Sequence, residues 1–158
     1  MAAWASSNIT AGSDTTAILL RAIFYNLLKS PASLDRLRRE IHAAGLPALV
    51  PWSRARAELP YLDAVVKEAT RMHPSFGLPY ERVVPGPEPA VVCGKVLPPG
   101  TIVGMSAWVV GRDRDLYGQD ADEWRPERWL DEEGLDEEHR KKMEAGLLAV
   151  SIRLLFIS

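Results

Sequence analysis

Apolar residues recur at helical spacing through the first third of the chain, in two sets separated by Ser30-Pro31. Serine caps helices and proline suits the first helical turn, so this pair predicts the end of one helix and the start of another. The second helix is predicted to end at Gly45, before a loop over 46–54 that includes a short helical turn after Pro51. The apolar positions of the two helices are Leu20, Ile23, Phe24, Leu27, Leu28 and Leu34, Leu37, Ile41.

A third helix is predicted over about Pro60–Met72, and the sequence then becomes rich in proline, glycine and valine. Short strands are predicted there at Tyr80–Val84, Ala90–Val92 and Thr101–Met105. The segment 111–131 is predicted to be irregular but ordered, because its tryptophans and Tyr117 need something to pack on. A last helix is predicted over 136–149, so the fold class is mainly α with a small β portion.

The composition of the chain excludes several classes of protein function. The 158 residues suit one domain, and 19 basic against 21 acidic residues give a net charge of −2, which argues against a nucleic-acid binder. The sequence contains no run of 18 apolar residues, so no membrane span is predicted. The single cysteine, Cys93, excludes an internal disulfide and is predicted to be a small buried hydrophobe. The three histidines show no metal-ligand spacing, so no metal site is predicted.

The run Ala11-Gly12-Ser13-Asp14-Thr15-Thr16 consists largely of residues that are poor in helix interiors. One interpretation makes it a helix N-terminus, with Ser13 as the cap and Asp14 in the first turn. The other places it inside a bent helix, where a carboxylate beside a hydroxyl could deliver protons to a bound ligand.

Two further patterns are each open to a plain and a functional interpretation. Glu68 and Arg71 are spaced i, i+3 on the third helix, so they lie on one side of it. They form either an exposed ion pair or part of a buried polar node that a third residue completes. An arginine of the segment Trp124-Arg125-Pro126-Glu127-Arg128-Trp129 is a candidate for that partner, or the segment is a surface loop. Arg82 either ends a solvated strand or grips a carboxylate or phosphate.

The order and spacing of these motifs closely resemble the cytochrome P450 family, and the segment from Gly111-Arg112-Asp113 to Trp129-Leu130 looks like its fungal microsomal branch. The resemblance rests on the Ala11–Thr16 run, on Glu68-x-x-Arg71 followed by Met72-His73-Pro74, and on Pro126–Trp129, and it covers about 5–130. It implies a haem-thiolate monooxygenase, which inserts one oxygen atom from dioxygen into a small, apolar organic substrate. It also implies an electron-donating reductase as partner and, for the parent enzyme, the endoplasmic reticulum membrane.

The resemblance implies roles for individual residues. Asp14 and Thr15 correspond to the acid–alcohol pair that supports proton delivery at the haem. Ala11 and Gly12 correspond to small residues against the haem, and Arg82 to a partner of a haem propionate. Glu68, Arg71 and Arg128 correspond to a structural salt-bridge triad.

The chain departs from the family pattern in its tail. The family holds its iron through the cysteine of a Phe-x-x-Gly-x-Arg-x-Cys-x-Gly loop after the Pro-Glu-Arg segment, and no cysteine follows that segment here. We therefore expect a fragment: a partial cytochrome P450 domain over 1–142, and an apolar, non-native tail over 143–158 that promotes aggregation. The alternatives are a non-catalytic helical interaction or regulatory fragment, a pseudoenzyme, or a non-expressed artefact.

Overall fold

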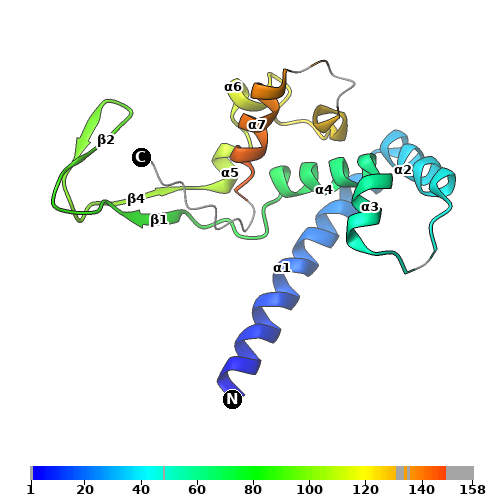
Figure 1. Cartoon of the computed structure of the whole chain (residues 1–158), viewed down its shortest axis with the longest axis horizontal. Helices are drawn as coiled ribbons and strands as arrows, with labels where there is room; N and C mark the ends of the chain where they lie inside the picture. Colours follow the sequence, from blue (N-terminus) through cyan, green and yellow to red (C-terminus); the bar gives the residue numbers. More distant parts are fainter. Residues whose placement is uncertain (1, 48, 131–133, 135, 149–158) are drawn as a thin grey trace.

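The computed structural model describes residues 2–47, 49–130, 134 and 136–148, and the side chains from residue 8 onward. The helices among them are α1 (Ala2–Lys29), α2 (Pro31–Ala44), α3 (Trp52–Glu58), α4 (Pro60–Met72), α5 (Ala107–Val110), α6 (Arg114–Tyr117), the 3-10 turn η1 (Pro126–Trp129) and α7 (Glu137–Gly146). The strands are β1 (Tyr80–Val83), β2 (Ala90–Val92), β3 (Lys95–Leu97) and β4 (Ile102–Met105). The described chain is thus mainly helical with a small β portion (Figure 1).

The helix boundaries follow the local sequence signals. α2 begins with Pro31 and ends before Gly45, whose φ of 55° places it in the left-handed region that favours glycine. α4 spans the predicted residues, and the Glu40 carboxylate of α2 accepts hydrogen bonds from the backbone N–H groups of Tyr61 (2.7 Å) and Leu62 (3.0 Å). Glu40 therefore satisfies two of the free donors at the start of α4 and fixes α2 against it.

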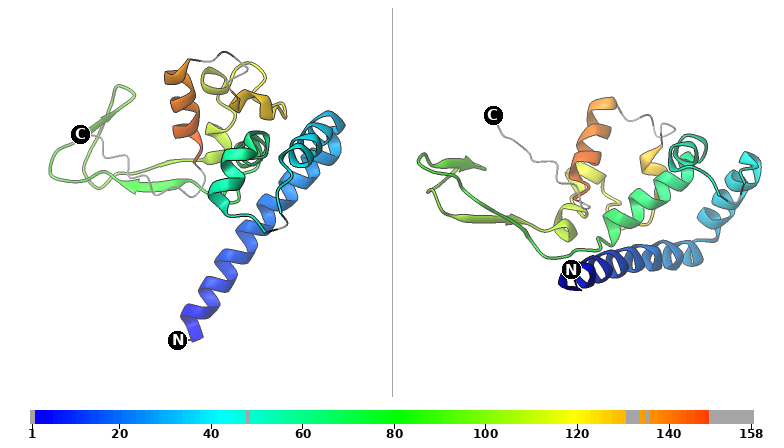
Figure 2. Two further views of the ribbon diagram at one scale, coloured as in Figure 1. Left: turned by 45° about the vertical axis from the view of Figure 1, so that its right-hand side comes forward. Right: turned by 60° about the horizontal axis from the view of Figure 1, so that its bottom comes forward.

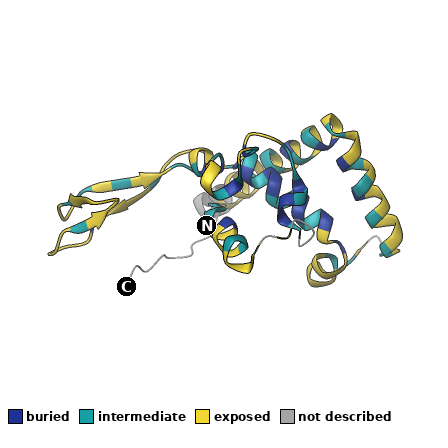
Figure 3. Cartoon of the chain, turned by 90° about the horizontal axis from the view of Figure 1, so that it is seen from above, coloured by how far each residue is buried: buried dark blue, intermediate teal, exposed yellow. Residues whose placement is uncertain are grey.

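The strands form an arm that extends from the helical body (Figures 1 and 3). β1 pairs antiparallel with β4, from Tyr80 opposite Met105 to Val83 opposite Ile102, and β2 pairs antiparallel with β3. β3 was not predicted from the sequence. The prediction that Cys93 is buried is wrong: it is exposed in the turn between β2 and β3, with a φ of 49°. A tight turn needs a positive φ there, and this outweighed the apolar character of the flanking valines.

The core surrounds α4 and consists of two clusters. The first joins α1, α2 and α4 through Leu27, Leu37, Tyr61 and Val65. The second joins α4 to the later segments and contains Ala64, Tyr117, Ala121, Trp129 and Met143. Figure 3 shows buried residues concentrated in this region and exposed residues along the arm.

α1 packs over only part of its length and surface. The helix runs past the body, and its N-terminal half projects away from the other elements (Figures 1 and 2). Of its predicted apolar positions, Leu27 is 3% exposed, whereas Phe24 and Leu28 are 62% and 72% exposed. The periodicity predicted the helix correctly, but three of its five apolar positions, Leu20, Phe24 and Leu28, are exposed.

The segment predicted to be irregular but ordered contains α6 and η1. The Asp113 carboxylate accepts hydrogen bonds from the backbone N–H groups of Asp115 and Leu116 and so caps α6. The rings of Tyr117 and Trp129 lie 5.9 Å apart between centroids, so the aromatic side chains do pack inside. Asp131 and residues 149–158 of the predicted apolar tail lie outside the described residues. Within the described part of the chain, no helix is both long and apolar enough to cross a membrane.

Candidate functional site

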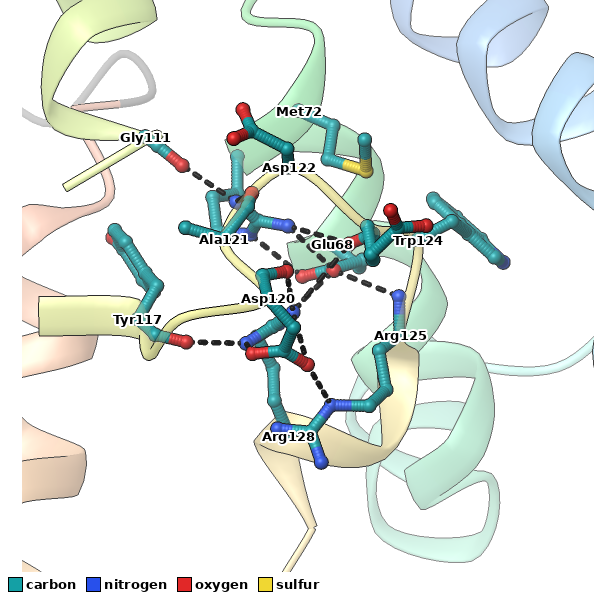
Figure 4. Close-up of polar contacts among 12 residues, drawn as sticks. Glu68, Met72, Gly111, Tyr117, Asp120, Ala121, Asp122, Trp124, Arg125 and Arg128 are labelled. Carbon is teal, nitrogen blue, oxygen red and sulfur yellow. Dashed lines mark hydrogen bonds and ion pairs between the residues drawn. The ribbon is translucent and has the colours of Figure 1, made fainter. Parts of the chain in front are cut away.

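The Glu68 carboxylate is the centre of a buried polar node (Figure 4). Its Oε1 accepts hydrogen bonds from Arg71 Nη2 (2.7 Å), the Arg125 backbone N–H (3.0 Å) and Arg128 Nε (3.1 Å). Its Oε2 accepts from Arg71 Nε and Trp129 Nε1, each at 2.9 Å. Five donors therefore surround one carboxylate whose side chain is 0% exposed, and these hydrogen bonds offset the cost of desolvating its charge.

Arg71 extends the node to the backbone of the later segments. Its Nη1 donates to the carbonyls of Gly111 and Ala121, each at 2.5 Å, and its Nη2 donates to the carbonyl of Glu123 at 3.1 Å. Position 111 also lies against the backbone of α4, where a Cβ would clash with the Arg71 carbonyl oxygen, so a glycine is required there. One α4 side chain thus positions backbone that lies 40 to 52 residues later in the chain.

Arg128 completes the node from η1. Its Nη1 donates to the carbonyl of Tyr117, and its Nη2 donates to the carbonyl of Asp120 at 3.0 Å. The Asp120 carboxylate lies 3.3 Å from Arg128 Nη1 and 2.7 Å from Arg125 Nε. Partial burial would raise the pKa of Asp120, but the hydrogen bond and charge of Arg128, together with Arg125, hold that pKa below its ordinary value.

Asp120 supplies a second negative charge for the two buried arginines, and it also pairs with partly exposed Arg125. Arg71 and Arg128 carry two positive charges, and Glu68 and Asp120 carry two negative ones, with the first three side chains at most 1% exposed. The structure thus brings together the three residues of the expected triad. The alternative of an exposed Glu68–Arg71 pair is wrong, because the later segments cover the pair and supply its remaining partners.

The Ala11–Thr16 run lies in the interior of α1, nine residues and more from its first residue. The interpretation of Ser13 as a helix cap is therefore wrong. The Ser13 hydroxyl donates to the Ile9 carbonyl at 2.7 Å, and the Thr15 hydroxyl donates to the Ala11 carbonyl at 2.9 Å. Hydroxyls that bond back to the preceding turn are satisfied inside a helix, which explains how these residues are accommodated.

One hydrogen bond fixes this run relative to the end of α4. The Ser75 hydroxyl donates to the Thr15 backbone carbonyl at 2.9 Å, across 60 residues of sequence. At 3.6 residues per turn, Ala11 and Thr15 share a face of α1 with Ile18 and Ala22, which lie beside the end of α4. Ile18 and Ala22 line a hollow of about 480 Å³, whose other walls include Met72, His73, Trp108 and Arg112.

The remaining site candidates lie apart from the node. Asp14 is exposed on α1, and Gly12 has open space around its Cα. Arg82 is exposed in β1, and its Nη1 donates to the carbonyl of the adjacent Glu81 at 2.7 Å.

The residues present fit a haem-thiolate group only in part. Gly12 has open space beside it, as a flat ring system requires. The sequence supplies no thiolate for the opposite side of such a ring, because Cys93 is the only cysteine and lies in the arm. Among the described residues, no group of three or more His, Cys, Asp or Glu side chains is arranged to hold a metal ion. Within these 158 residues, therefore, one side of such a ring finds room and no thiolate is supplied for the other side.

Sequence reasoning missed several contributors to the node. Trp129 was expected to pack, but its indole N–H also donates to Glu68. Asp120 and Gly111 carried no distinguishing signal, because each acts through a contact with residues far along the chain. The pattern of two arginines between two tryptophans was the one local signal that pointed to this segment.

These features define a helical assembly in which a long first helix and a Glu-x-x-Arg helix are joined to a Pro-Glu-Arg turn. A match to the family described as Cytochrome P450 spans residues 1–145. The chain therefore belongs to the cytochrome P450 family.

Individual relatives agree with this assignment. A cytochrome P450 monooxygenase of Aspergillus terreus is 60% identical over 152 residues, which cover 94% of this chain and 30% of that protein. The cytochrome P450 monooxygenase mpaDE of Penicillium roqueforti is 52% identical over 151 residues, which cover 92% of this chain and 17% of that protein. A structure of a zebra fish cytochrome P450 with progesterone superimposes with a TM-score of 0.63 at 26% identity, covering 80% of this chain and 29% of that one. The chain spans less than a third of each of these proteins.

Proposed function

We propose that this chain is the part of a haem-thiolate monooxygenase that supplies the oxygen-facing helix and the buried Glu–Arg–Arg node, and that it does not turn over substrate by itself. One observation carries the proposal. The node of Glu68, Arg71 and Arg128 is complete within a chain that has no cysteine near it. A structural element of the family is therefore present without the residue that would ligate the iron.

Within the whole enzyme, the residues of α1 would have separate roles. Ala11 and Gly12 would leave space for the haem, which supplies the oxygen chemistry when bound. Asp14 and Thr15 would hold a carboxylate and a hydroxyl at that turn for proton transfer. Arg82 would bind a propionate. The substrate would be a small, apolar organic molecule, and electrons would come from a reductase.

The first test is spectroscopic and uses the 158-residue chain with haemin. After reduction under carbon monoxide, we expect no red-shifted Soret band, because that band requires an axial thiolate. A red-shifted band would overturn the proposal that the chain lacks the ligand. A folded chain whose circular dichroism and stability do not change with haemin would favour the non-catalytic interaction fragment instead.

A second test asks whether the segment is functional when the rest of the enzyme is present. Residues 5–130 would replace the corresponding segment of the Aspergillus terreus relative, and the chimera is expected to show the red-shifted carbon monoxide band. Glu68→Gln in the chimera is expected to abolish that band, because the buried arginines lose their counter-charge. Glu58→Gln is the matched control, since Glu58 forms an exposed pair with Arg54 on α3. A soluble, folded chimera without the band would contradict the proposal.

A further inference from the structure

The turn η1 carries two adjacent charged side chains that reach different partners. Arg128 is buried in the node, whereas the neighbouring Glu127 side chain is 30% exposed and lies outside it. The Tyr61 hydroxyl donates to Glu127 Oε1 at 2.9 Å, and Arg36 Nη1 lies 3.7 Å from the same oxygen. Two consecutive residues of η1 are therefore held by two separate sets of side chains.

Both sets include a residue from the same face of α4. Tyr61 and Glu68 are seven residues apart, which is close to two full helical turns. Their side chains therefore leave α4 on the same side, about 10 Å apart along its axis. Tyr61 holds Glu127, and Glu68 holds Arg128. One attachment alone would let a short turn rotate about it, whereas two separated attachments fix both its position and its rotation.

α2 supplies the rest of this outer contact. The Arg36 guanidinium lies over the Tyr61 ring, 4.5 Å from the ring centroid. The Ser33 hydroxyl, one turn earlier on α2, accepts a hydrogen bond from Trp124 Nε1 at 3.3 Å, just before η1. Because Glu40 already fixes α2 against the start of α4, these contacts tie the approach to η1 to a braced pair of helices.

The Tyr61 hydroxyl suits this contact because it keeps its proton. Tyr61 is 2% exposed, and burial raises the pKa of its phenol to about 12, so the hydroxyl is the donor to Glu127 at neutral pH. The ring packs in the core cluster with Leu27, Leu37 and Val65. The donor is therefore held in place before η1 meets it.

η1 is too short to maintain this arrangement alone. It is a 3-10 turn of four residues, and the hydrogen-bond geometry of such turns is poor. Arg128 nevertheless reaches Glu68 and the carbonyls of Tyr117 and Asp120 at the same time. Rotation of η1 would withdraw Arg128 from all three partners together.

We propose that Tyr61 and Arg36 are positioning residues for the buried node. By holding Glu127 they fix the rotation of η1, and this keeps Arg128 against Glu68. The inference goes beyond the function proposed above and does not depend on haem binding, because every contact that it uses lies within α2, α4 and residues 124–129.

The test is hydrogen exchange measured by NMR on the 158-residue chain. Two reporter groups, the Arg125 backbone amide and the Trp129 indole N–H, donate to Glu68 and show whether the node is closed (Figure 4). Tyr61→Phe keeps the ring and removes the hydroxyl. It is expected to speed exchange at both reporter groups about tenfold, because the node opens more often once η1 can rotate.

The Leu62 amide separates positioning from a general loss of stability. It donates to Glu40 at the start of α4, and under Tyr61→Phe its exchange is expected to change less than about twofold, because α2 and α4 stay together. A residue that only adds stability to the whole fold would speed exchange at Leu62, Arg125 and Trp129 alike.

Four further variants make the test specific. Glu127→Gln keeps an oxygen that accepts from Tyr61 and is expected to speed exchange at the reporter groups by no more than about threefold, whereas Glu127→Ala is expected to match Tyr61→Phe. Arg36→Gln is expected to give about threefold, because its ion pair is partly exposed. Tyr25→Phe is the matched control: its hydroxyl is bonded to Lys29 on α1, and the reporter groups are expected not to change.

Unchanged exchange at the reporter groups in Tyr61→Phe would overturn the proposal. So would an equal acceleration at Leu62, an effect of the same size from Tyr25→Phe, or a Glu127→Gln variant that behaves like Glu127→Ala. An Arg125 amide that is unprotected in the unchanged chain would overturn it as well, since the node would then be open whether or not Tyr61 holds η1.

Discussion

α4 and α1 show that apolar character and burial are different properties. α4 is short, and its charged residues Glu68 and Arg71 are among the most buried of the described chain. α1 is twice as long, yet Phe24 and Leu28 on its outer face are largely exposed. The difference arises from the neighbours: segments from α2 to η1 surround α4, whereas α1 is covered on one face over part of its length.

Burial of charge in this fold therefore depends on partners supplied from far along the chain. Glu68 is stable in the interior because five donors meet it, and those donors come from α4 itself and from residues 125–129. Four changes, taken from the largest expected effect to the smallest, test this contrast between the α4 region and α1.

Glu68→Ala is expected to have the largest effect. It removes the counter-charge of two buried arginines, and breaking a buried ion pair in this way costs about 3–5 kcal/mol. Urea unfolding followed by circular dichroism measures the loss. Glu58→Ala, in an exposed pair on α3, serves as the control and should change stability by less than about 0.5 kcal/mol. Equal effects of the two substitutions would show that the node contributes little.

Arg71→Lys is expected to have the second largest effect and to lower the free energy of unfolding by about 2 kcal/mol. Lysine keeps the charge, but it cannot reach two carboxylate oxygens and the carbonyls of Gly111 and Ala121 at once. The same unfolding measurement applies, with Arg54→Lys on exposed α3 as the matched change. A tolerated Arg71→Lys would mean that charge alone, rather than the planar guanidinium, is required.

The contribution of Asp120 to the stability of the α4 region is expected to depend on pH. Its pKa is held below the ordinary value, so its charge stabilises the fold above about pH 4 and that contribution is lost as the pH falls through the folded pKa. Asp120→Asn is expected to cost about 1 kcal/mol or less at pH 6, since the side chain is 35% exposed, and less still near pH 3. Unfolding at both pH values checks this, with Asp35→Asn on α2 as control. A cost that grows as the pH falls would contradict the assignment.

Phe24→Ala is expected to have the smallest effect on the stability of the fold. The ring is 62% exposed, so its removal should change the free energy of unfolding by less than about 0.5 kcal/mol in dilute solution. Thermal unfolding at low protein concentration measures it. A large loss would show that Phe24 packs inside the fold.

Local signals predicted much of the secondary structure. The Ser30-Pro31 boundary and the bounds of α4 followed from capping residues and proline, whose effects act within a turn. The third strand was missed because three residues between turn signals leave almost no pattern, and Cys93 was misplaced for the same reason. The extent of α1 was equally hidden, since back-bonded hydroxyls let poor helix formers lie inside it.

The node was predictable only through the order of its motifs. Glu68 and Arg71 lie away from the apolar stripe of their helix, so periodicity places them in solvent. Their burial depends on Arg128 and on carbonyls at 111–123, contacts that no local rule connects to α4. The family resemblance identified the three residues of the triad, whereas the roles of Asp120 and of the Trp129 indole became visible only in the three-dimensional structure.

The separation of 60 residues between Glu68 and Arg128 has a consequence for biosynthesis. At about 5–20 residues per second, Arg128 leaves the ribosome roughly 3–12 s after Glu68. During that interval α4 carries a carboxylate and a guanidinium whose final partners do not yet exist, so water must solvate them. The polar groups of α4 therefore cannot reach their full set of buried partners until the Pro-Glu-Arg turn has emerged.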